Sequence, residues 1–294
     1  MPQNPPAVSA SAAGTLALGD LTVNRMGYGA MRITGKGIWG PPADHDAAIA
    51  TLRRAAELGV NFIDTADSYG PYVSEELIAE ALAPYPQGLV VATKGGWERV
   101  GPGQWIHNAS PKHLQSAVEG SLKRLRLDRI DVYQLHIPDP AVSFDASMET
   151  LAKLRDAGKI RHVALSNVTL EHLERARKIV PIVSVQSRYS FADREWDFLL
   201  NYCEKNNIAF IPWAPLGQNR QAHDALDKAA GELGATPLQV ALAWLLQRSK
   251  IILPIPGTSS VAHVEENIAA AALKLPNRVF EDLSAVSSPP AVLR

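Results

Sequence analysis

Residues 61–70 read Asn61-Phe62-Ile63-Asp64-Thr65-Ala66-Asp67-Ser68-Tyr69-Gly70. The apolar pair Phe62-Ile63 closes a pattern typical of a buried strand, and Ser68-Tyr69-Gly70 is typical of a turn. A carboxylate therefore stands at a strand end, five positions before a loop tyrosine. The same spacing recurs at Asp67/Tyr72, Asp128/Tyr133 and Asp197/Tyr202. Whether the pair Asp64/Tyr69 has a function therefore depends on the elements around it.

Short apolar runs rich in β-formers alternate with longer helical patterns from Val60 onward. This alternation predicts an α/β fold made of βα units around a parallel sheet. The expected strands cover residues 26–31, 61–64, 89–94, 130–136, 162–165, 182–186, 209–213 and 251–254. Eight strands are the number of a closed (β/α)8 barrel, the TIM barrel. Residues 16–23 predict an N-terminal β-hairpin around Gly19-Asp20, which we expect to plug the barrel's N-terminal end.

Capping residues mark several of the expected helices. Asp46 is expected to cap a helix that runs to Gly59, and Ser74 is expected to cap the next one. Ser110 and Thr236 each precede a proline, which fits a cap followed by the first helical position. The helices between the strands are therefore predicted from local signals as well as from periodicity.

Composition limits the class of partner. The 294 residues include 29 basic and 30 acidic side chains and no basic block, so we expect no nucleic acid and no membrane as partner, but a small molecule. A single cysteine, Cys203, fits a reducing compartment. Residues 1–13 are expected to be a flexible tail without the features of a secretory signal, and residues 14–294 a single domain. We expect a cytoplasmic protein, monomeric by default.

Polar residues fall where such a barrel places its chemistry, at the C-terminal ends of the strands. The expected strand ends carry Asp64, Lys94, His136, Ser166-Asn167, Gln186, Trp213 and the turn Pro256-Gly257-Thr258. Tyr133 falls inside a strand and Tyr202 inside a helix, so two of the four Asp/Tyr pairs are not expected to be catalytic. Tyr72 shares the loop with Tyr69 and remains a minor rival.

The strand-end residues suggest an acid built from a phenol. A tyrosine with a pKa of ~10 is protonated near neutral pH but donates its proton slowly. Lys94 would stabilise the phenolate, and Asp64 would keep that ammonium charged and oriented. His136 would hydrogen-bond a substrate carbonyl oxygen, orienting it or helping to move a proton. The structural alternative is a buried ion pair beside a core histidine, which we consider weaker because four such residues share the strand ends.

The same motifs resemble those of the aldo-keto reductase family over about residues 15–285. The matching stretches are residues 62–70, 92–94, 131–136, 164–167, 185–186, 213–217 and 254–258, followed by Glu266-Asn267. The resemblance implies a catalytic tetrad of Asp64, Tyr69, Lys94 and His136. In this tetrad Tyr69 protonates the carbonyl oxygen as hydride arrives from a reduced nicotinamide.

The resemblance also implies the cofactor residues. Ser166, Asn167 and Gln186 would hold the carboxamide of the nicotinamide, and Trp213 would stack on its ring. The other implied positions are Gly29, Ala30, Met31, Asp64, Ala214, Pro215, Leu216, Gly217, Pro256, Gly257, Thr258, Ser259, Ser260, His263, Glu266 and Asn267. The chain has no Gly-x-Gly-x-x-Gly, so a doubly wound dinucleotide site is not predicted.

The adenosine 2′-phosphate is expected at residues 256–267. Ser259 or Ser260 would cap a helix whose free N–H groups favour a phosphate. Gly257 and His263 stand where many family members carry lysine and arginine. A site without a permanent cation discriminates less strongly between the two nicotinamide cofactors. We nevertheless expect NADP(H) in preference to NAD(H).

The substrate pocket is expected to contain Met31, Trp39 and Trp97 beside Tyr69 and His136. The turn 255–260 and the start 27–31 resemble a bacterial subset of the family that includes pyridoxal reductases. We therefore expect NADPH-dependent reduction of an aldehyde or ketone to an alcohol, with an aromatic aldehyde such as pyridoxal as the leading substrate class.

Two other functions stay open at this level. Some family members keep the tetrad and act as nicotinamide-binding, redox-sensing regulatory subunits. A barrel lyase with Lys94 as a Schiff base is the second alternative, against which the pairing with Asp64 argues. The eight histidines show no metal-binding spacing, so no metal site is expected.

Overall fold

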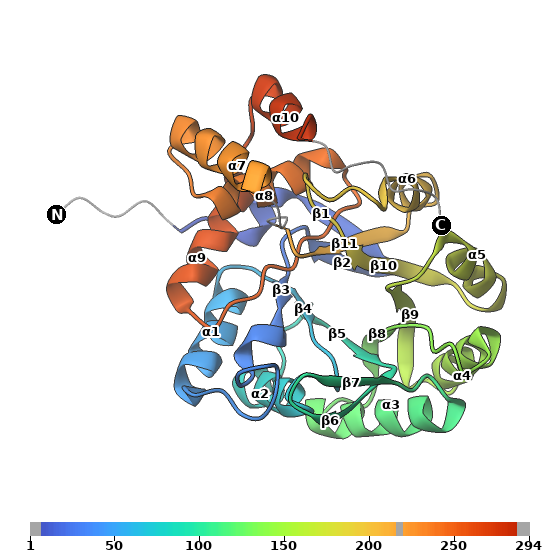
Figure 1. Cartoon of the computed structure of the whole chain (residues 1–294). Helices are drawn as coiled ribbons and strands as arrows, with labels where there is room; N and C mark the ends of the chain where they lie inside the picture. The colour runs from blue at the N-terminus through green and yellow to red at the C-terminus, as the bar shows by residue number, and fades with distance from the viewer. Residues whose placement is uncertain (1–6, 216–219, 287–294) are drawn as a thin grey trace.

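A curled parallel sheet lies at the centre of the computed structural model, which describes residues 7–215 and 220–286 (Figure 1). Its seven strands are joined in the order β11-β10-β9-β8-β5-β4-β3, and all neighbours are parallel. The strands are β3 (Tyr28–Gly29), β4 (Phe62–Asp64), β5 (Val90–Gly95), β8 (Ile130–Leu135), β9 (Ile160–Ser166), β10 (Ile182–Arg188) and β11 (Ala209–Trp213). The α/β class and the order of the βα units are as the sequence predicts.

The expected eighth strand, residues 251–254, is a single bridge to β11 rather than a strand. Three backbone hydrogen bonds nevertheless close the barrel through it: Phe210 N–H to Ile251 O, Leu253 N–H to Phe210 O and Gly27 N–H to Pro254 O, each 2.9 Å. Pro254 and Pro256 have no N–H to donate, so a regular ladder cannot continue beyond Leu253.

The barrel interior is filled by an apolar cluster that includes Phe62, Val90, Ala92, Val132, Ala164, Ile211 and Leu253. Leu18 and Val23 belong to the same cluster. They come from β1 (Thr15–Leu18) and β2 (Leu21–Asn24), an antiparallel hairpin. The predicted N-terminal hairpin is thus confirmed, and its buried residues close one end of the barrel.

Part of the expected flexible tail is packed. Residues Ala10–Ala13 form the short helix η1, Ala10 is buried, and its N–H donates to Leu58 O at 2.8 Å. Gly59 makes this approach possible, because a β carbon there would lie 2.5 Å from Ser9 Oγ. The first sheet strand is also shorter than expected, since η2 (Ala30–Ile33) begins directly after Gly29.

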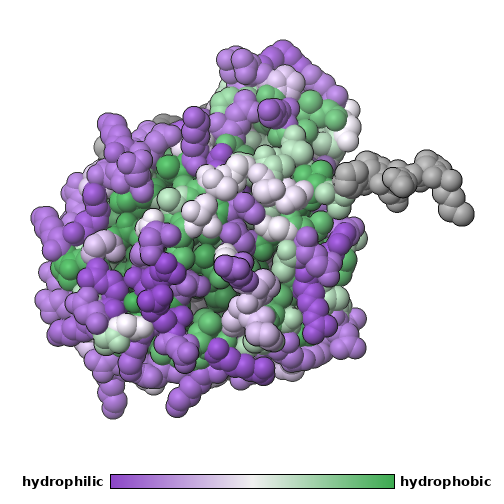
Figure 2. Space-filling model, turned by 180° about the vertical axis from the view of Figure 1, so that it is seen from behind, coloured by the Kyte–Doolittle hydropathy of each residue, from purple (hydrophilic) through white to green (hydrophobic). Residues whose placement is uncertain are grey.

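Helices cover the outside of the sheet (Figure 1). They are α1 (His45–Glu57), α2 (Val73–Leu82), α3 (Pro111–Leu125), α4 (Phe144–Asp156), α5 (Leu170–Ile179), α6 (Asp197–Lys205), α7 (Arg220–Leu233), α8 (Pro237–Arg248), α9 (Val261–Ala269), η3 (Ala270–Ala272) and α10 (Asn277–Ser284). On the face in Figure 2, hydrophilic residues dominate the periphery and hydrophobic residues gather toward the middle. Among the described residues, no helix combines the length and hydrophobicity needed to cross a membrane.

The helix caps agree with the sequence at two of four positions. Ser110 Oγ accepts from His113 N–H, and Thr236 forms a capping box with Gln239. The expected cap at Asp46 is wrong, because Asp44 accepts from the N–H of Ala47 at 2.9 Å and α1 begins one residue before Asp46. Local spacing allowed either aspartate.

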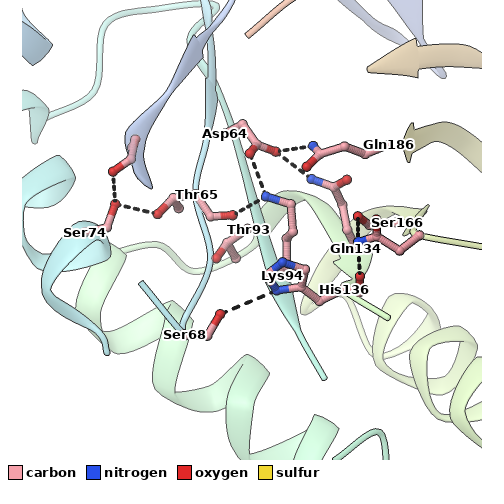
Figure 3. Close-up of polar contacts among 12 residues, drawn as sticks. Asp64, Thr65, Ser68, Ser74, Thr93, Lys94, Gln134, His136, Ser166 and Gln186 are labelled. Carbon is pink, nitrogen blue, oxygen red and sulfur yellow. Dashed lines mark hydrogen bonds and ion pairs between the residues drawn. The ribbon is translucent and has the colours of Figure 1, made fainter. Parts of the chain in front are cut away.

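The expected cap at Ser74 is also wrong. Helix α2 begins at Val73 after Tyr72, which has a left-handed φ of 72° and no capping side chain. Ser74 Oγ instead accepts from Thr65 Oγ1 at 2.7 Å and donates to Ala30 O at 3.1 Å. The hydroxyl therefore ties the loop after β4 to the residue after β3 (Figure 3).

A second hairpin follows β5 and was not expected from the sequence. Strands β6 (Trp97–Gly101) and β7 (Gln104–His107) pair antiparallel, outside the main sheet. Its half-buried residues alternate with exposed ones, as in a hairpin that covers other parts of the protein with one face only.

Candidate active site

Neighbouring strand ends bring the predicted tetrad together. Asp64 ends β4, Lys94 lies near the end of β5, and His136 directly follows β8. Tyr69 comes from the loop between β4 and α2. All four side chains are buried, with residue exposures of 2% for Asp64, 0% for Lys94 and 7% each for Tyr69 and His136. Their burial removes water from the polar contacts among them.

The Lys94 ammonium is paired inside the barrel mouth (Figure 3). Its Nζ donates to Asp64 Oδ1 at 2.6 Å and to Thr65 O at 2.9 Å. Burial acts to lower the pKa of Lys94, but the charges and hydrogen bonds of Asp64 and Tyr69 outweigh burial, so the pKa of Lys94 is raised. Lys94 is therefore an ammonium at neutral pH.

Two glutamines fix the other oxygen of the same carboxylate. Gln134 Nε2 and Gln186 Nε2 donate to Asp64 Oδ2 at 2.8 and 2.9 Å (Figure 3). With Lys94, three side-chain donors hold Asp64, which is what a buried charge requires. Gln134 had no role in the sequence analysis. Gln134 is identified by strand pairing, because it stands opposite Lys94 in the register of β5 and β8.

The loop after β4 continues the hydrogen bonding of the sheet and so places Tyr69. Thr65 N–H donates to Ala92 O at 2.8 Å, and Asp67 N–H donates to Lys94 O at 3.2 Å. Gly70 then turns the chain with a φ of 104°, and a β carbon there would lie 2.5 Å from Val73 Cβ. The tyrosine thus sits on a segment anchored to β5.

Lys94 Nζ lies 5.2 Å from the centre of the Tyr69 ring. Burial raises the pKa of the phenol, and although Lys94 acts to lower it, the net pKa stays above the ordinary value. The phenol is therefore fully protonated at neutral pH. An ammonium beside a protonated phenol can stabilise the phenolate that forms when the proton is given away.

His136 meets Tyr69 edge to face, with ring centres 5.9 Å apart. Burial, helped by the charge of Lys94, holds the pKa of His136 well below its usual value. Ser68 Oγ lies 3.5 Å from Nδ1, at the limit of a hydrogen bond (Figure 3). The imidazole is neutral at neutral pH and suits a hydrogen bond to a carbonyl oxygen.

The rival pair of the same loop is not assembled for this chemistry. Residue Tyr72 is 49% exposed, with the Arg124 guanidinium 4.1 Å from its ring centre. Asp67 is buried, and desolvation together with nearby Glu75 raises the pKa of its carboxyl well above the usual value. Tyr72 therefore has no buried ammonium beside it, unlike Tyr69.

The residues expected around the nicotinamide form an arc beside the tetrad. Asn167 Nδ2 donates to His136 O at 3.1 Å and to Ser166 Oγ at 3.0 Å, and Asn167 N–H donates to Gln186 O at 2.9 Å. Trp213 ends β11 and is 38% exposed, although the rest of that strand is buried. An exposed indole at a strand end fits a planar ring that stacks on it.

Two glycines bring backbones together at the other end of the predicted cofactor site. A β carbon on Gly29 would lie 2.6 Å from Ile255 O, and one on Gly257 would lie 2.4 Å from Gly29 O. A lysine at position 257 would therefore need a shift of the backbone. Arg32, exposed in η2, places its Cγ 3.6 Å from that β-carbon position. No sequence motif predicts a cation at this position.

The turn before α9 gathers polar side chains at the start of a helix. Ser260 is the N-cap of α9, as one of the two expected serines, but its side chain makes no capping hydrogen bond. Thr258 Oγ1 instead accepts from Ser260 N–H at 3.1 Å and lies 3.5 Å from His263 Nδ1. Ser259 and His263 are exposed. This polar turn fits a phosphate.

The adenine positions divide into two kinds. Glu266 Oε1 accepts from Thr236 Oγ1 at 2.6 Å, and Glu266 O accepts from Gln239 Nε2 at 2.9 Å, so Glu266 also fixes the start of α8. Asn267 is 2% exposed, and its Oδ1 has no partner among the described residues. An unpartnered buried acceptor fits an amine donor of a ligand. Leu216 and Gly217 lie outside the described residues.

Aromatic rings line the expected substrate side. The Trp97 ring centre is 6.4 Å from that of His136, 4.3 Å from His107 and 5.7 Å from Trp105. Trp39 is linked by a bridge to Gly70, one residue after Tyr69. Half-buried Met31 lies in η2, in the segment after β3. Trp105 and His107 were not expected here from the sequence, and both come from β7.

A surface hollow lies away from this site. The hollow, of about 410 Å³, lies between α1 and the first residue of α9, and its lining includes Arg53, Arg54 and Glu57. Arg54 is already paired with Glu57 and Glu265. The lining of the hollow includes none of the strand-end residues, so the hollow has no part in the chemistry expected of the tetrad.

The chain is similar in sequence and structure to known proteins. A family model described as Aldo/keto reductase family matches residues 25–288. An oxidoreductase of Schizosaccharomyces pombe is 50% identical over 279 residues, 94% of this chain and 91% of the relative. Pyridoxine 4-dehydrogenase of Escherichia coli is 46% identical over 280 residues, 93% of this chain and 98% of the relative. An aldo-keto reductase of Klebsiella pneumoniae, solved with NADPH, has a TM-score of 0.79 and 27% identity, covering 94% of this chain and 96% of that one.

Proposed function

Because the chain belongs to the aldo/keto reductase family, we propose that Tyr69 is the general acid with which it reduces carbonyl compounds at the expense of NADPH. The observation that carries the proposal is the buried group of Asp64, Lys94, Tyr69 and His136. A protonated phenol, an adjacent ammonium and a neutral imidazole converge there from neighbouring elements.

Each residue has a defined part in the reaction. The bound nicotinamide supplies the hydride for the carbonyl carbon. Tyr69 donates its proton to the carbonyl oxygen, and Lys94 stabilises the phenolate that remains. His136 donates a hydrogen bond to the same oxygen and orients it. Asp64 keeps Lys94 charged and in place through the 2.6 Å hydrogen bond.

The cofactor would lie across the strand ends. Ser166, Asn167 and Gln186 are placed for the carboxamide, although Gln186 also donates to Asp64. Trp213 would stack on the nicotinamide, and Asn267 offers its unpartnered Oδ1 to the adenine amine. The turn 256–260, which Arg32 and His263 flank, would take the 2′-phosphate. The NADPH in the Klebsiella pneumoniae relative supports NADP(H) over NAD(H).

The substrate class that fits best is an aromatic aldehyde of the pyridoxal type. The Escherichia coli relative is named for its action on pyridoxine, the corresponding alcohol. Rings of Trp97 and His107 stand beside His136, where a planar substrate would pack. A Schiff base on Lys94 is disfavoured, because that amine is fully buried and bonded to Asp64 as an ammonium.

Cofactor oxidation across a panel of carbonyls tests the proposal. We expect pyridoxal and nitrobenzaldehyde to oxidise NADPH faster than methylglyoxal, aldoses and simple ketones do, and NADH to serve less well. Tight NADPH binding without turnover of any of these would sink the reductase assignment, and with a stable partner in a pull-down it would favour a redox-sensing regulatory subunit instead.

A further inference from the structure

The β6–β7 hairpin presents one set of side chains to the site and another to solvent. In its register Trp97 pairs with His107 and Arg99 pairs with Trp105, and all four are half-buried. Val100 and Ile106, which alternate with them, are 58% and 47% exposed. The half-buried face is the one that meets His136, through Trp97.

Arg99 is the cation at the centre of this face. Its Nη1 donates to Ile38 O at 3.0 Å and to Ser68 O at 2.9 Å, and its Nη2 donates to Gly37 O at 3.3 Å. Its guanidinium carbon lies 3.7 Å from the Trp105 ring centre and 5.5 Å from that of Trp39. Three segments that are distant in sequence therefore meet on one side chain.

The contacts reach the segment that carries the catalytic tyrosine. Ser68 directly precedes Tyr69, so the hydrogen bond from Arg99 to Ser68 O attaches the hairpin to the segment of the acid, which the hydrogen bond from Asp67 N–H to Lys94 O already anchors to β5. The loop of residues 35–40 docks on the same segment, because Gly40 N–H donates to Gly70 O at 2.6 Å and Gly70 N–H donates to Ile38 O at 3.3 Å. Arg99 ties that loop to the hairpin.

The chemistry of the contacts requires a guanidinium. The partners of Arg99 are backbone carbonyls and indole rings, and no carboxylate of the described residues forms an ion pair with it. A planar fork donates to several carbonyls at once while stacking between rings, which a lysine ammonium does not do. The Arg99 side chain therefore joins the three segments and does not neutralise a carboxylate.

We propose that Arg99 is a positioning residue that joins the β6–β7 hairpin and the 35–40 loop to the Tyr69 segment, and that the resulting wall of Trp39, Trp97, Trp105 and His107 selects planar aromatic aldehydes. The selectivity rests on the proposed reductase function, whereas the joining of the three segments does not. Small aldehydes, which do not span the wall, depend on it far less.

Replacement of Arg99 by alanine tests the selectivity. We expect kcat/KM for pyridoxal to fall between about tenfold and a hundredfold, mainly through KM, with kcat/KM for methylglyoxal nearly unchanged and NADPH affinity retained. Guanidinium chloride at millimolar concentration should restore part of the pyridoxal activity, and sodium chloride should not. Arg99→Lys should resemble the alanine variant, and Ile106→Ala, on the exposed face, should behave as wild type.

Hydrogen exchange tests the joining without any substrate. In Arg99→Ala the amides of residues 35–40 and 97–107 should exchange faster, while those of α4 and α5 stay protected. Unchanged protection of both segments, or an equal loss of activity toward pyridoxal and methylglyoxal, would overturn the inference. Wild-type protein that fails to reduce pyridoxal would instead count against the proposed substrate class, and the exchange result would still decide the role of Arg99.

Discussion

Polar residues at the ends of β4 and β5 are buried and bonded to one another, whereas those of the turn before α9 face solvent. Asp64 and Lys94 are 2% and 0% exposed, and three side-chain donors hold Asp64. Ser259 and His263 are exposed. The fold alone organises the ends of β4 and β5, whereas the polar groups before α9 would be ordered by a bound phosphate.

The difference bears on how each region responds to change. Removal of one member of a buried charge pair leaves the other charge desolvated and unpaired, which costs several kcal/mol. Removal of one exposed contact to an anion loses a screened interaction of small size. The proposed catalytic region should therefore fail as a unit, and the proposed phosphate region should weaken step by step.

Lys94→Met should have the largest effect. It leaves Asp64 buried without its cation, so we expect a loss of about 3–5 kcal/mol in the free energy of unfolding, together with loss of nearly all turnover. Urea unfolding and NADPH oxidation measure the two effects. Arg278→Met, which removes an exposed cation paired with Glu232 and Asp282, is the control and should leave both unchanged. A Lys94→Met protein as stable as wild type would contradict the contrast between the regions.

Gln134→Leu should have a smaller effect in the same region. One of the two amide donors to Asp64 Oδ2 is lost, which we expect to cost about 1.5–3 kcal/mol of stability and to lower turnover. Gln104→Leu changes the same residue type at an exposed position of β7 and should be neutral. Equal stability of the two variants would show that the carboxylate does not depend on Gln134.

Acid should destabilise the catalytic region through His136. Its pKa in the folded protein is held well below the usual value, so below about pH 6.5 the unfolded chain binds a proton that the folded chain does not. The free energy of unfolding should then fall by up to about 1.4 kcal/mol per pH unit on acidification. His136→Gln should reduce this slope, although His113 and His172, whose pKa values burial also lowers, leave a remainder. An unchanged slope would refute the contribution of His136.

Arg32→Gln should have the smallest effect, at the phosphate region. Loss of an exposed cation beside Gly257 should raise the Kd of NADPH about fivefold, the equivalent of about 1 kcal/mol, and leave the Kd of NADH unchanged. Fluorescence titration measures both constants. Lys36→Gln, a change of a nearby exposed cation, is the control. An equal loss for both cofactors would remove Arg32 from the discrimination of the 2′-phosphate.

The catalytic strand ends were predictable because their positions follow from the fold. The C-terminal ends of parallel strands meet at one rim of the barrel, so Asp64, Lys94 and His136 could be placed near one another in advance. Contacts that depend on neighbouring elements could not be predicted from the sequence. Gln134 is identified only by its register with Lys94. Ser74 does not cap a helix but makes hydrogen bonds to Thr65 and Ala30.

Backbone chemistry accounts for other differences. The prolines at 254 and 256 limit the expected last strand to a bridge. The β6–β7 hairpin interrupts the βα rhythm, and its signals were the alternation in residues 97–100 and the turn Gly101-Pro102-Gly103. Gly257 needed the structure to explain it, because the close approach of Gly29 O is not visible in the sequence.

Comparison of Tyr69→Phe with wild type tests the central claim most directly. The change removes only the phenolic oxygen, so NADPH should bind with nearly the same Kd in a fluorescence titration. Turnover of pyridoxal, followed as NADPH oxidation, should fall by about a hundredfold to ten-thousandfold, the usual contribution of a general acid. A Tyr69→Phe protein that binds NADPH and reduces pyridoxal at the wild-type rate would show that Tyr69 is not the proton donor.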